Sequence, residues 1–400
     1  MWRAGGIVLL FCSQELAAPL AIEEHEFSLR PPSGWTARPG LRPTVVKFVR
    51  ALEGKPDAEL LVTHLMTTNP TPLEGFKTQA RAHIAERYKD ARVLEERTLT
   101  LAGRPAWQIA FVHKGVVHVK VAIHRTHLEY YVLDALLAES EAARLRPGVE
   151  ASIASFAIVP VAPTPEEQTA LRRTKAVLAG LAVDPAAAGE RWYTLHLGGR
   201  RAGHQRTKLE VVDGRYALEA ELVLDLGDGN KDASTVKGTF TPDGRVQTLE
   251  TVQTKENDKK ERWLFKSSAT LEGGRLRVRR DMNGLEEETT LQVEEGAWLA
   301  DLGDALRPFI ARHGRGTYAL KTLSPFSDEA NLEQIEAGVL ERLKVDGRER
   351  EVLLVQAVVD RRRTMTYFYG PDARLVRLGG EKDVFLLREA TREEAEPGKK

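Results

Sequence analysis

Histidine is the residue type whose spacing first suggests chemistry in this chain. His113, His118, His124 and His127 fall within fifteen residues, and imidazole is the commonest metal ligand in proteins. If the segment is a strand, His118 and His124 share a face but lie roughly 20 Å apart, whereas shared coordination needs contacts of about 2 Å. We therefore expect His124 to face Glu129 as a polar cross-strand pair. A two-histidine, one-carboxylate site would need a third group from elsewhere.

A second acidic stretch resembles a calcium-binding loop only at its beginning. Asp228, Asn230 and Asp232 have the alternating spacing of the first calcium ligands. Ala233 and Thr239 then stand where such a loop needs glycine and a bidentate glutamate. The stretch is therefore expected to be a hairpin loop.

No familiar catalytic motif is present. The segment LGGRRAGH at 197–204 lacks the Gly-Lys-Ser/Thr end of a phosphate-binding loop, and His25 with Glu26 lacks the second histidine of a zinc protease motif. The single cysteine, Cys12, lies in the amino-terminal apolar run. We therefore predict no catalytic, cofactor-binding or metal-binding residues and no cofactor. An enzyme with an unrecognised hydrolytic site built from distant residues is an alternative.

The composition indicates a globular protein whose net charge favours no particular class of partner. The chain has 400 residues, of which 42% are apolar, and it carries 58 basic and 58 acidic side chains. This length predicts two domains, and the balanced charge argues against binding to nucleic acid. The basic run at 361–363 follows Asp360 and is expected to be a solvated turn.

Residues 1–21 have the pattern of an export signal. Arg3 precedes a short apolar run at 7–12, and small residues such as Ala18 and Ala21 follow it. The protein is therefore expected to be periplasmic or extracellular, or cytoplasmic if the signal does not function. No later segment is apolar enough to predict a transmembrane helix.

The predicted first domain, residues 22–160, combines strands with two helices. Strand-like runs in 26–66 precede a helix that should begin with a capping box of Thr71 and Glu74 and with Pro72 at its first position. Its apolar face would comprise Leu73, Phe76, Ala80 and Ile84. Four strands joined by tight turns are predicted over 92–135, followed by a helix from about Pro147 to Ser155.

The second half is predicted to be one long antiparallel sheet. Residues 161–190 read as a linker with a short helix, 191–395 as a β-rich domain, and 396–400 as a tail. Turn pairs such as Asp213–Gly214 and Asn283–Gly284 mark the hairpins. Apolar residues alternate with charged ones along 218–226, so one face should be dry; its residues are Leu218, Ala220, Leu222, Leu224 and Leu226. A helix is predicted from Trp298 to His313.

The first domain resembles the PsbP-like family, whose relatives include Ran-binding Mog-type proteins. The resemblance rests on FSLRPPSGW at the start, TLTLAGRPAWQIAF, LEYYVLDAL and the closing SIASFAIV. It implies an αβα sandwich with an antiparallel sheet that docks to other proteins.

The second half resembles exported bacterial β-domains of unknown function, some of which are compared with LolA-type lipoprotein carriers. The residues concerned are WYTLHLGGRRAGHQRTKLEV, FTPDGRVQTLE and TYFYGPDARLVRL. The resemblance implies a curved sheet with a concave apolar side.

The fold class expected is therefore α+β, with an αβα sandwich followed by a curved antiparallel sheet. The function expected is that of a noncatalytic exported binding or docking protein that holds an apolar small molecule, a lipid or a protein partner. A structural or assembly factor of the cell envelope is a further alternative. The sequence leaves the oligomeric state open.

Overall fold

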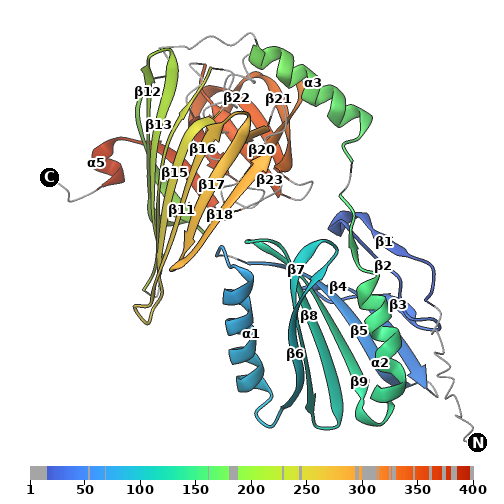
Figure 1. The fold of residues 1–400 in the computed structure, drawn as a ribbon. Helices are drawn as coiled ribbons and strands as arrows, with labels where there is room; N and C mark the ends of the chain where they lie inside the picture. Colours follow the sequence, from blue (N-terminus) through green and yellow to red (C-terminus); the bar gives the residue numbers. More distant parts are fainter. Residues whose placement is uncertain are drawn as a thin grey trace, which may run out of the picture. The chain divides into compact units, whose positions relative to one another are not determined.

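The computed structural model describes residues 16–396, apart from 53–54, 68, 161, 180–187, 228, 243–245, 293–296, 300–312, 314, 324–325, 327–329, 346, 360–362, 372–374 and 380–384. The chain divides into two compact units, Met1–Ala162 and Pro163–Lys400. Both consist mainly of antiparallel strands with few helices (Figure 1). The prediction of mostly antiparallel sheets is confirmed at this level.

The first unit is built on a seven-stranded antiparallel sheet. Its spatial order is β3 (Thr36–Pro39), β4 (Thr44–Leu52), β5 (Lys55–Met66), β9 (Glu129–Ala138), β8 (Val116–Thr126), β7 (Arg104–His113) and β6 (Arg92–Leu101). The predicted four-stranded meander therefore forms β6 to β9. A smaller sheet joins β1 (Leu20–Ile22), β2 (Phe27–Leu29) and β10 (Ala157–Ile158), with the short helix η1 (Glu23–His25) after β1.

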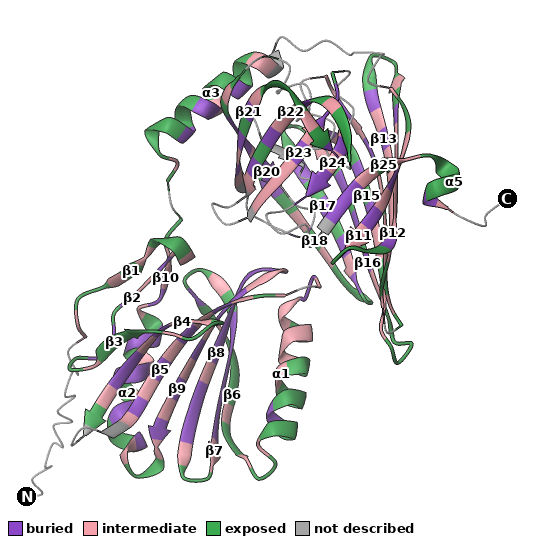
Figure 2. Ribbon diagram, turned by 180° about the vertical axis from the view of Figure 1, so that it is seen from behind, coloured by how far each residue is buried: buried purple, intermediate pink, exposed green. Residues whose placement is uncertain are grey.

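Two helices pack in separate apolar clusters of the first unit. Helix α1 (Leu73–Arg87) places Phe76 and Ile84 in an apolar cluster with Trp107, Phe111 and Tyr130. Helix α2 (Glu139–Ala154) contributes to a second cluster; its members include Leu145, Val149, Ile153, Val119, Val121 and Leu133. Consecutive residues of β7 and β8 are buried (Figure 2). Because neighbouring residues of a strand point to opposite faces of the sheet, both faces of these two strands are covered.

The predicted capping box at the start of α1 is wrong. Pro72 is the N-cap, and no side chain caps the helix. The Thr71 hydroxyl instead donates to the Asn69 carbonyl at 2.9 Å, while the Thr71 carbonyl accepts the Tyr130 hydroxyl at 2.6 Å. Thr71 is thus bound to the β8–β9 corner rather than to its own helix.

Helix α2 begins eight residues before the predicted start at Pro147, which lies inside the helix. Proline lacks an N–H group and costs a helix interior roughly 3 kcal/mol. The preceding turns nevertheless bury Ala142 and Leu145 in the core. This packing outweighs the local preference of proline for the first turn.

The described part of the predicted signal segment takes part in the fold. Leu16 forms a bridge with Pro32, and Leu20 pairs with Leu29 in the small sheet. Residues 1–15 lie outside the described residues. Cleavage directly after Ala21 would cut β1, so the signal peptide remains a prediction with its cleavage point unassigned.

The second unit contains a single fifteen-stranded sheet. From one edge, the order starts with β18 (Leu285–Gln292), β17 (Arg275–Met282), β16 (Arg262–Glu272), β15 (Val246–Glu256), β14 (Asn230–Phe240), β13 (Arg215–Gly227), β12 (Arg200–Val212) and β11 (Gly189–Leu197). It continues with β25 (Phe385–Ala390), β24 (Leu375–Gly379), β23 (Arg363–Tyr369), β22 (Arg348–Val359), β21 (Ala330–Val345), β20 (Gly316–Leu323) and β19 (Ala297–Leu299). The short helix α5 (Arg392–Ala395) follows β25.

Tight turns connect these strands where the sequence predicted them. Asp213 and Gly214 both have positive φ, as do Asn283 and Gly284. Two successive positive φ angles give the turn whose twist matches that of the flanking strands. The predicted turns at 243–244 and 361–362 lie outside the described residues.

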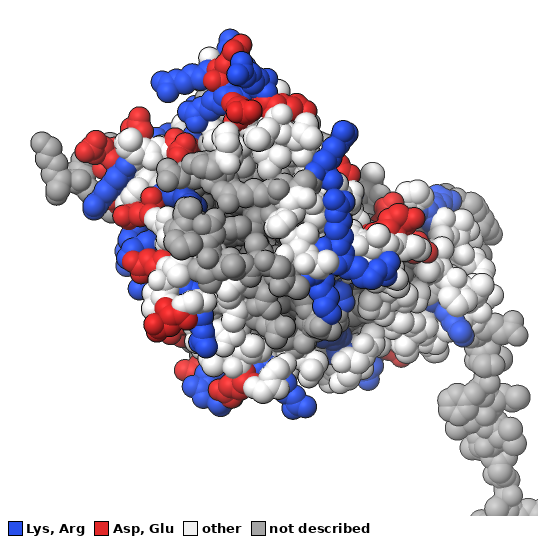
Figure 3. All heavy atoms as spheres, turned by 90° about the horizontal axis from the view of Figure 1, so that it is seen from above, with Lys and Arg blue, Asp and Glu red and all other residues white. Residues whose placement is uncertain are grey.

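The two faces of the β12–β18 part of the sheet differ in polarity. We call the face that carries Leu218 and Val278, both buried, the inner face. The outer face carries a cross-strand row of mostly alternating charge, formed by Lys208, Glu219, Lys237, Glu250, Ser268, Arg279 and Glu288. Acidic and basic side chains also lie near one another on the face drawn in Figure 3. This row favours one strand register, because a shift would place like charges opposite one another.

The helix expected in the linker belongs to the second unit. Helix α3 (Pro165–Ala179) begins with a capping box in which Thr164 accepts the Glu167 N–H and Glu167 accepts the Thr164 N–H. The guanidinium of Arg173 lies 4.5 Å from the ring centroid of Tyr318 in β20. The linker prediction missed these contacts because it followed composition alone.

The predicted helix from Trp298 to His313 does not begin at Trp298. That residue lies in β19, which pairs in parallel with β20. Residues 300–312 lie outside the described residues.

The hydroxyl of Thr174 tests how α3 is attached. It is buried, donates to the Ala170 carbonyl at 2.9 Å and accepts the Ala319 N–H at 3.0 Å. We expect Thr174→Val to destabilise this contact by about 1–3 kcal/mol, because the Ala319 N–H loses its acceptor. Hydrogen-exchange mass spectrometry should show faster exchange in peptides from β20. Thr169→Val, on the exposed side of the same helix, should leave that exchange unchanged; equal exchange in both variants would contradict the proposed attachment.

Candidate functional site

Antiparallel register arranges the inner face of β12–β18 into rows that run across the strands. We call one of them the apolar row; it consists of Leu209, Leu218, Gly238, Leu249, Ala269 and Val278. All six residues are buried. Their packing forms part of the largest apolar cluster of the second unit.

The next row along the strands changes character from one side of the sheet to the other. This polar row consists of Thr207, Ala220, Val236, Thr251, Ser267, Arg280 and Glu287. Thr251, Ser267 and Arg280 are only 8%, 5% and 2% exposed. Burying polar groups in an otherwise apolar interior is unfavourable unless they are hydrogen-bonded, so this row requires an explanation.

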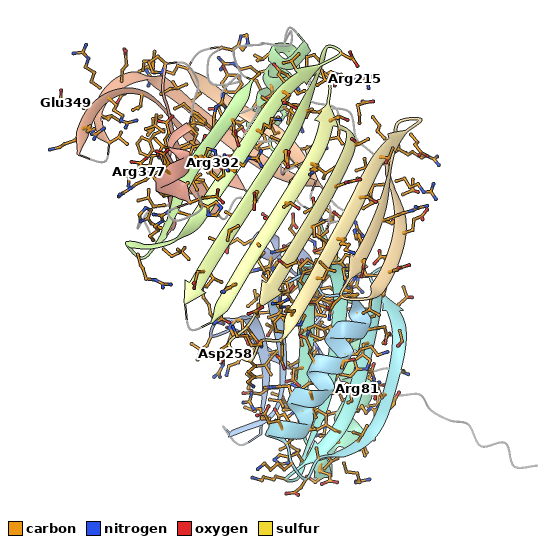
Figure 4. The ribbon with its side chains drawn as sticks, turned by 90° about the vertical axis from the view of Figure 1, so that its left-hand side faces the viewer. Arg81, Arg215, Asp258, Glu349, Arg377 and Arg392 are labelled. Atoms are coloured by element: carbon orange, nitrogen blue, oxygen red, sulfur yellow. The ribbon has the colours of Figure 1, made fainter. Side chains whose placement is uncertain are left out.

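Polarity continues toward the end of the strands that carries the turn at Asp258, opposite the end at Arg215 (Figure 4). Asp232 on the inner face accepts hydrogen bonds from Gln253 at 3.2 Å and lies 3.5 Å from the Lys255 ammonium. Burial also decreases in this direction along β13, from Leu218 to the exposed Leu226. The predicted dry face is therefore dry at only one end.

A cavity of about 740 Å³ lies over the polar row. Its lining consists of four short runs, 250–252, 266–268, 279–281 and 286–288. The middle residue of each run belongs to the polar row, and the residues on either side of it belong to the outer face. Its volume falls in the range of small-molecule sites, roughly 300–1,000 Å³.

Among the described residues, the polar row holds an ion pair of Arg280 with Glu287 and two hydroxyl groups without a hydrogen-bond partner. The Arg280 Nη1 donates to the Glu287 Oε1 at 3.2 Å; the Arg280 side chain is 1% exposed and that of Glu287 36% exposed. The Thr251 and Ser267 hydroxyl oxygens are shielded from water and have no hydrogen-bond partner among the described residues. Each such hydroxyl costs roughly 1–3 kcal/mol.

Sequence reasoning missed these residues, although the strands contain a signal for them. Ser267 stands between Phe265 and Ala269, and Arg280 between Val278 and Met282, in the two-residue period of a buried strand face. A polar residue at such a position conflicts with core packing and therefore marks a candidate site.

The histidine cluster does not form one site. The His118 ring stacks on Phe111 with centroids 4.5 Å apart. The His124 Nε2 lies 3.1 Å from the His127 Nδ1. His124 pairs with Tyr130 rather than with Glu129, because the register shifts between His124 and Thr126. The predicted pairing with Glu129 is therefore wrong.

A second polar cluster in the first unit joins residues that are far apart in the sequence. The His25 and His64 Nδ1 atoms lie 3.2 Å apart. Arg125 donates to the Tyr131 hydroxyl at 3.0 Å, and Tyr131 donates to the His25 carbonyl at 2.8 Å. Burial raises the pKa of the Tyr131 phenol to about 12, although the Arg125 charge opposes the shift.

The expected calcium-like stretch lies in the β13–β14 hairpin. Asn230 donates to the Gly227 carbonyl, Asp232 bonds within the sheet, and Asp228 lies outside the described residues. Among the residues with described positions, no group of three or more His, Cys, Asp or Glu side chains is arranged to hold a metal ion. In the same part of the chain, no helix has the length and apolar character needed to cross a membrane.

Comparison with known proteins gives remote structural likenesses only. No protein-family profile matches the sequence, and no curated protein matches it. Cyanobacterial PsbP from Synechocystis is 11% identical over 40% of this chain and 98% of its own, with a TM-score of 0.30. The Ran-binding protein Mog1p of Saccharomyces cerevisiae is 11% identical over 36% and 97%, with a TM-score of 0.28.

A third likeness concerns a β-barrel-like DUF1849 protein from Brucella abortus. It is 15% identical, covers 50% of this chain and 93% of that protein, and has a TM-score of 0.37. With all three TM-scores below 0.5, the functional argument rests on the residues of this chain alone.

The first testable property of the site is the effect of the Thr251 and Ser267 hydroxyls on the free energy of unfolding. We expect Thr251→Val combined with Ser267→Ala to leave the free energy of unfolding unchanged or to raise it, because the variant removes buried groups without partners. Urea unfolding of the full chain measures this. Thr270→Val with Ser268→Ala changes the same residue types at outer-face positions of β16, which are exposed, and serves as the control. A loss above about 1 kcal/mol only in the inner-face variant would show that the hydroxyls have partners.

The raised pKa of Tyr131 gives a second testable property, this one in the first unit. An ionisable acid whose folded pKa lies above its unfolded value of about 10 stabilises the fold below pH 10, and this contribution is lost as pH rises to about 12. Tyrosinate absorbance of the wild type minus that of Tyr131→Phe should show one phenol ionising near pH 12. Ionisation of that phenol near pH 10 would mean that Tyr131 is exposed to solvent.

Proposed function

We propose that this protein is a noncatalytic binding protein whose second unit holds an amphiphilic small molecule in the cavity over the polar row. The observation that carries the proposal is the position of this row. Its buried Thr251, Ser267 and Arg280 lie directly beside the buried Leu249, Ala269 and Val278 of the apolar row.

The described lining of the cavity is polar apart from Val252, and the apolar row lies directly beside it. An amphiphile needs both kinds of contact, and polar groups placed next to apolar surface are the usual form of a small-molecule site. Burial of apolar ligand surface contributes roughly 25 cal/mol per Å². Hydrogen-bonding groups within the same cavity would then select the ligand and set its orientation.

The chemistry of the polar row favours binding over catalysis. Nucleophilic serine is activated by a base within hydrogen-bond reach. Among the residues with described positions, the Ser267 hydroxyl has no hydrogen-bond partner, and the cavity lining includes no histidine. Ser267 is therefore suited to contact a ligand but not to attack one.

The proposal extends to the first unit and to the location of the protein. We infer that the first unit is an αβα docking module of the PsbP type, supported by the packing of α1 and α2 in separate clusters on the two faces of one sheet. We also propose that the protein is exported, on the basis of the signal-like residues 1–21.

Nile red, a neutral apolar dye whose fluorescence rises in apolar surroundings, tests the cavity. We expect the purified full chain to bind the dye and Ser267→Phe to weaken binding at least about tenfold, because the added ring occupies part of the site. Thr270→Phe places the same ring on the exposed outer face, outside the cavity lining, and should bind as the wild type does. The measurement is fluorescence titration without detergent, with circular dichroism to establish that each variant is folded.

Two results would contradict the proposal. One is the absence of any saturable dye binding by the wild type. The other is an equal affinity of folded Ser267→Phe, which would place bound dye elsewhere.

A further inference from the structure

We infer that a second cavity, between α1 and strands β7–β9, anchors a partner protein by receiving a leucine-sized side chain from an acidic segment of that partner. The inference rests on the part of the proposed function that makes the first unit a docking module, and it names the chemistry of the partner. We call this cavity the α1 cavity; its apolar lining includes Phe76, Ala80, Ile84, Trp107, Ala122 and Val132.

Small side chains on both sides of the helix–sheet interface leave the α1 cavity unfilled. Ala80 of α1 and Ala122 of β8 both line it. Of the residues of α1, all of which have described positions, only Ile84 is buried. Protein interiors contain few voids larger than a water molecule. The space beneath α1 is therefore a candidate place for a side chain from outside.

The volume of the α1 cavity suits one aliphatic side chain. It measures about 120 Å³, whereas small-molecule sites have roughly 300–1,000 Å³. An apolar cavity of about 150 Å³ holds one benzene molecule. A leucine side chain therefore matches this cavity, but a larger ligand does not.

The α1 cavity reaches the surface of the first unit. The lining residues Phe76 and Val132 are half-buried, and the lining residues His83 and Arg87 are exposed. Trp107, by contrast, is buried in the wall. A side chain that enters past Arg87 would thus exchange water for apolar surroundings, which favours binding.

The charged residues of the described lining are all basic. They are His83, Arg87 and Lys120, and no carboxylate lies among the described lining residues. The Lys120 ammonium is paired with Asp134 of β9. Arg87 forms no ion pair with a described residue, and its guanidinium lies 5.7 Å from the ring centroid of Tyr88. Arg87 therefore leaves a positive charge at the exposed side of the cavity.

A carboxylate that contacts the wall from outside is already held. Glu96 of β6 accepts the Trp107 indole N–H at 2.6 Å and the Arg81 Nε–H at 2.8 Å. Its charge is thus offset by Arg81, and Arg87 remains available to a partner. Arginine pairs with carboxylates through charge-assisted hydrogen bonds. A carboxylate beside the anchoring side chain would supply this contact.

Three capped pentapeptides test the inference: Gly-Glu-Leu-Glu-Gly, the same peptide with Ala in place of Leu, and the same peptide with Gln in place of both Glu. Each is titrated against the full chain by saturation-transfer NMR. We expect the Leu peptide to bind at least about tenfold more tightly than the Ala peptide, because it buries the larger apolar side chain. We expect the Gln peptide to bind about two- to fivefold more weakly than the Glu peptide, because Arg87 is exposed to solvent. High salt should reduce that second difference.

A variant that fills the α1 cavity connects binding to this place. Ala80→Leu should weaken binding of the Leu peptide at least about tenfold, because its own side chain occupies the cavity. Ala82→Leu adds the same side chain at an exposed position of α1 outside the lining and should bind as the wild type does. Circular dichroism establishes that both variants are folded. Unchanged binding by folded Ala80→Leu would place the anchor elsewhere and overturn the inference.

A charge variant tests the acidic part of the partner. Arg87→Gln should remove the preference for Glu over Gln while the preference for Leu over Ala is retained. Lys89→Gln removes the same charge from an exposed position outside the lining and should keep both preferences. If Ala80→Leu does not fold, this pair of variants still decides whether the peptide lies beside Arg87.

The remaining outcomes separate this inference from the proposed function. Equal affinity of the Leu and Ala peptides, or of the Glu and Gln peptides, overturns the inference. A wild-type dimer in analytical ultracentrifugation that Ala80→Leu abolishes also overturns it, because the occupant would be a second copy of this chain. Absence of peptide binding overturns the inference but leaves the amphiphile site in place if the wild type and Ala80→Leu bind Nile red equally. Loss of dye binding in folded Ala80→Leu would place the dye in the α1 cavity and overturn the proposed function.

Discussion

The register of the antiparallel ladder is the constraint on which the second unit depends. Side chains alternate between faces with a period of two, so a shift of one residue would exchange the inner and outer faces of a strand. The opposed charges of Lys237 and Glu219, with Nζ and Oε1 3.6 Å apart, favour the observed pairing on one face. Buried packing of Leu249 and Val278 favours it on the other. The candidate site exists because this register places Thr251, Ser267 and Arg280 side by side.

Buried polar residues on the inner face lower the free energy of unfolding unless they are hydrogen-bonded. An apolar residue at position 267 or 280 would continue the pattern of Phe265, Ala269 and Val278 and would avoid buried polar atoms. Natural proteins tend to violate such local rules at functional sites. The ion pair of Arg280 with Glu287 reduces the cost of the charge, but the hydroxyls of Thr251 and Ser267 are compensated by no described residue.

Two copies of one local motif show how far sequence reasoning reaches in this chain. Thr71-Pro72-Leu73-Glu74 and Thr164-Pro165-Glu166-Glu167 both have the pattern of a capping box. Only the second forms it. The first threonine is held by the Asn69 carbonyl and by Tyr130, which comes from a distant strand. Both helices form, but the capping box was predicted only at Thr71, where its hydrogen bonds are absent, and it forms at Thr164, where it was not predicted.

Sequence by itself determined the hairpins and the alternation, because Asp213–Gly214, Asn283–Gly284 and the two-residue period are properties of neighbouring residues. It also indicated the four-stranded meander of the first unit and the apolar face of α1. Tertiary structure decided which strands pair and where α3 packs. It also decided that Thr251, Ser267 and Arg280 meet, because their row joins three strands through contacts that no local spacing records. The histidine cluster is the converse case, since His118 and His124 are near in sequence and share a face of the sheet but lie far apart along β8.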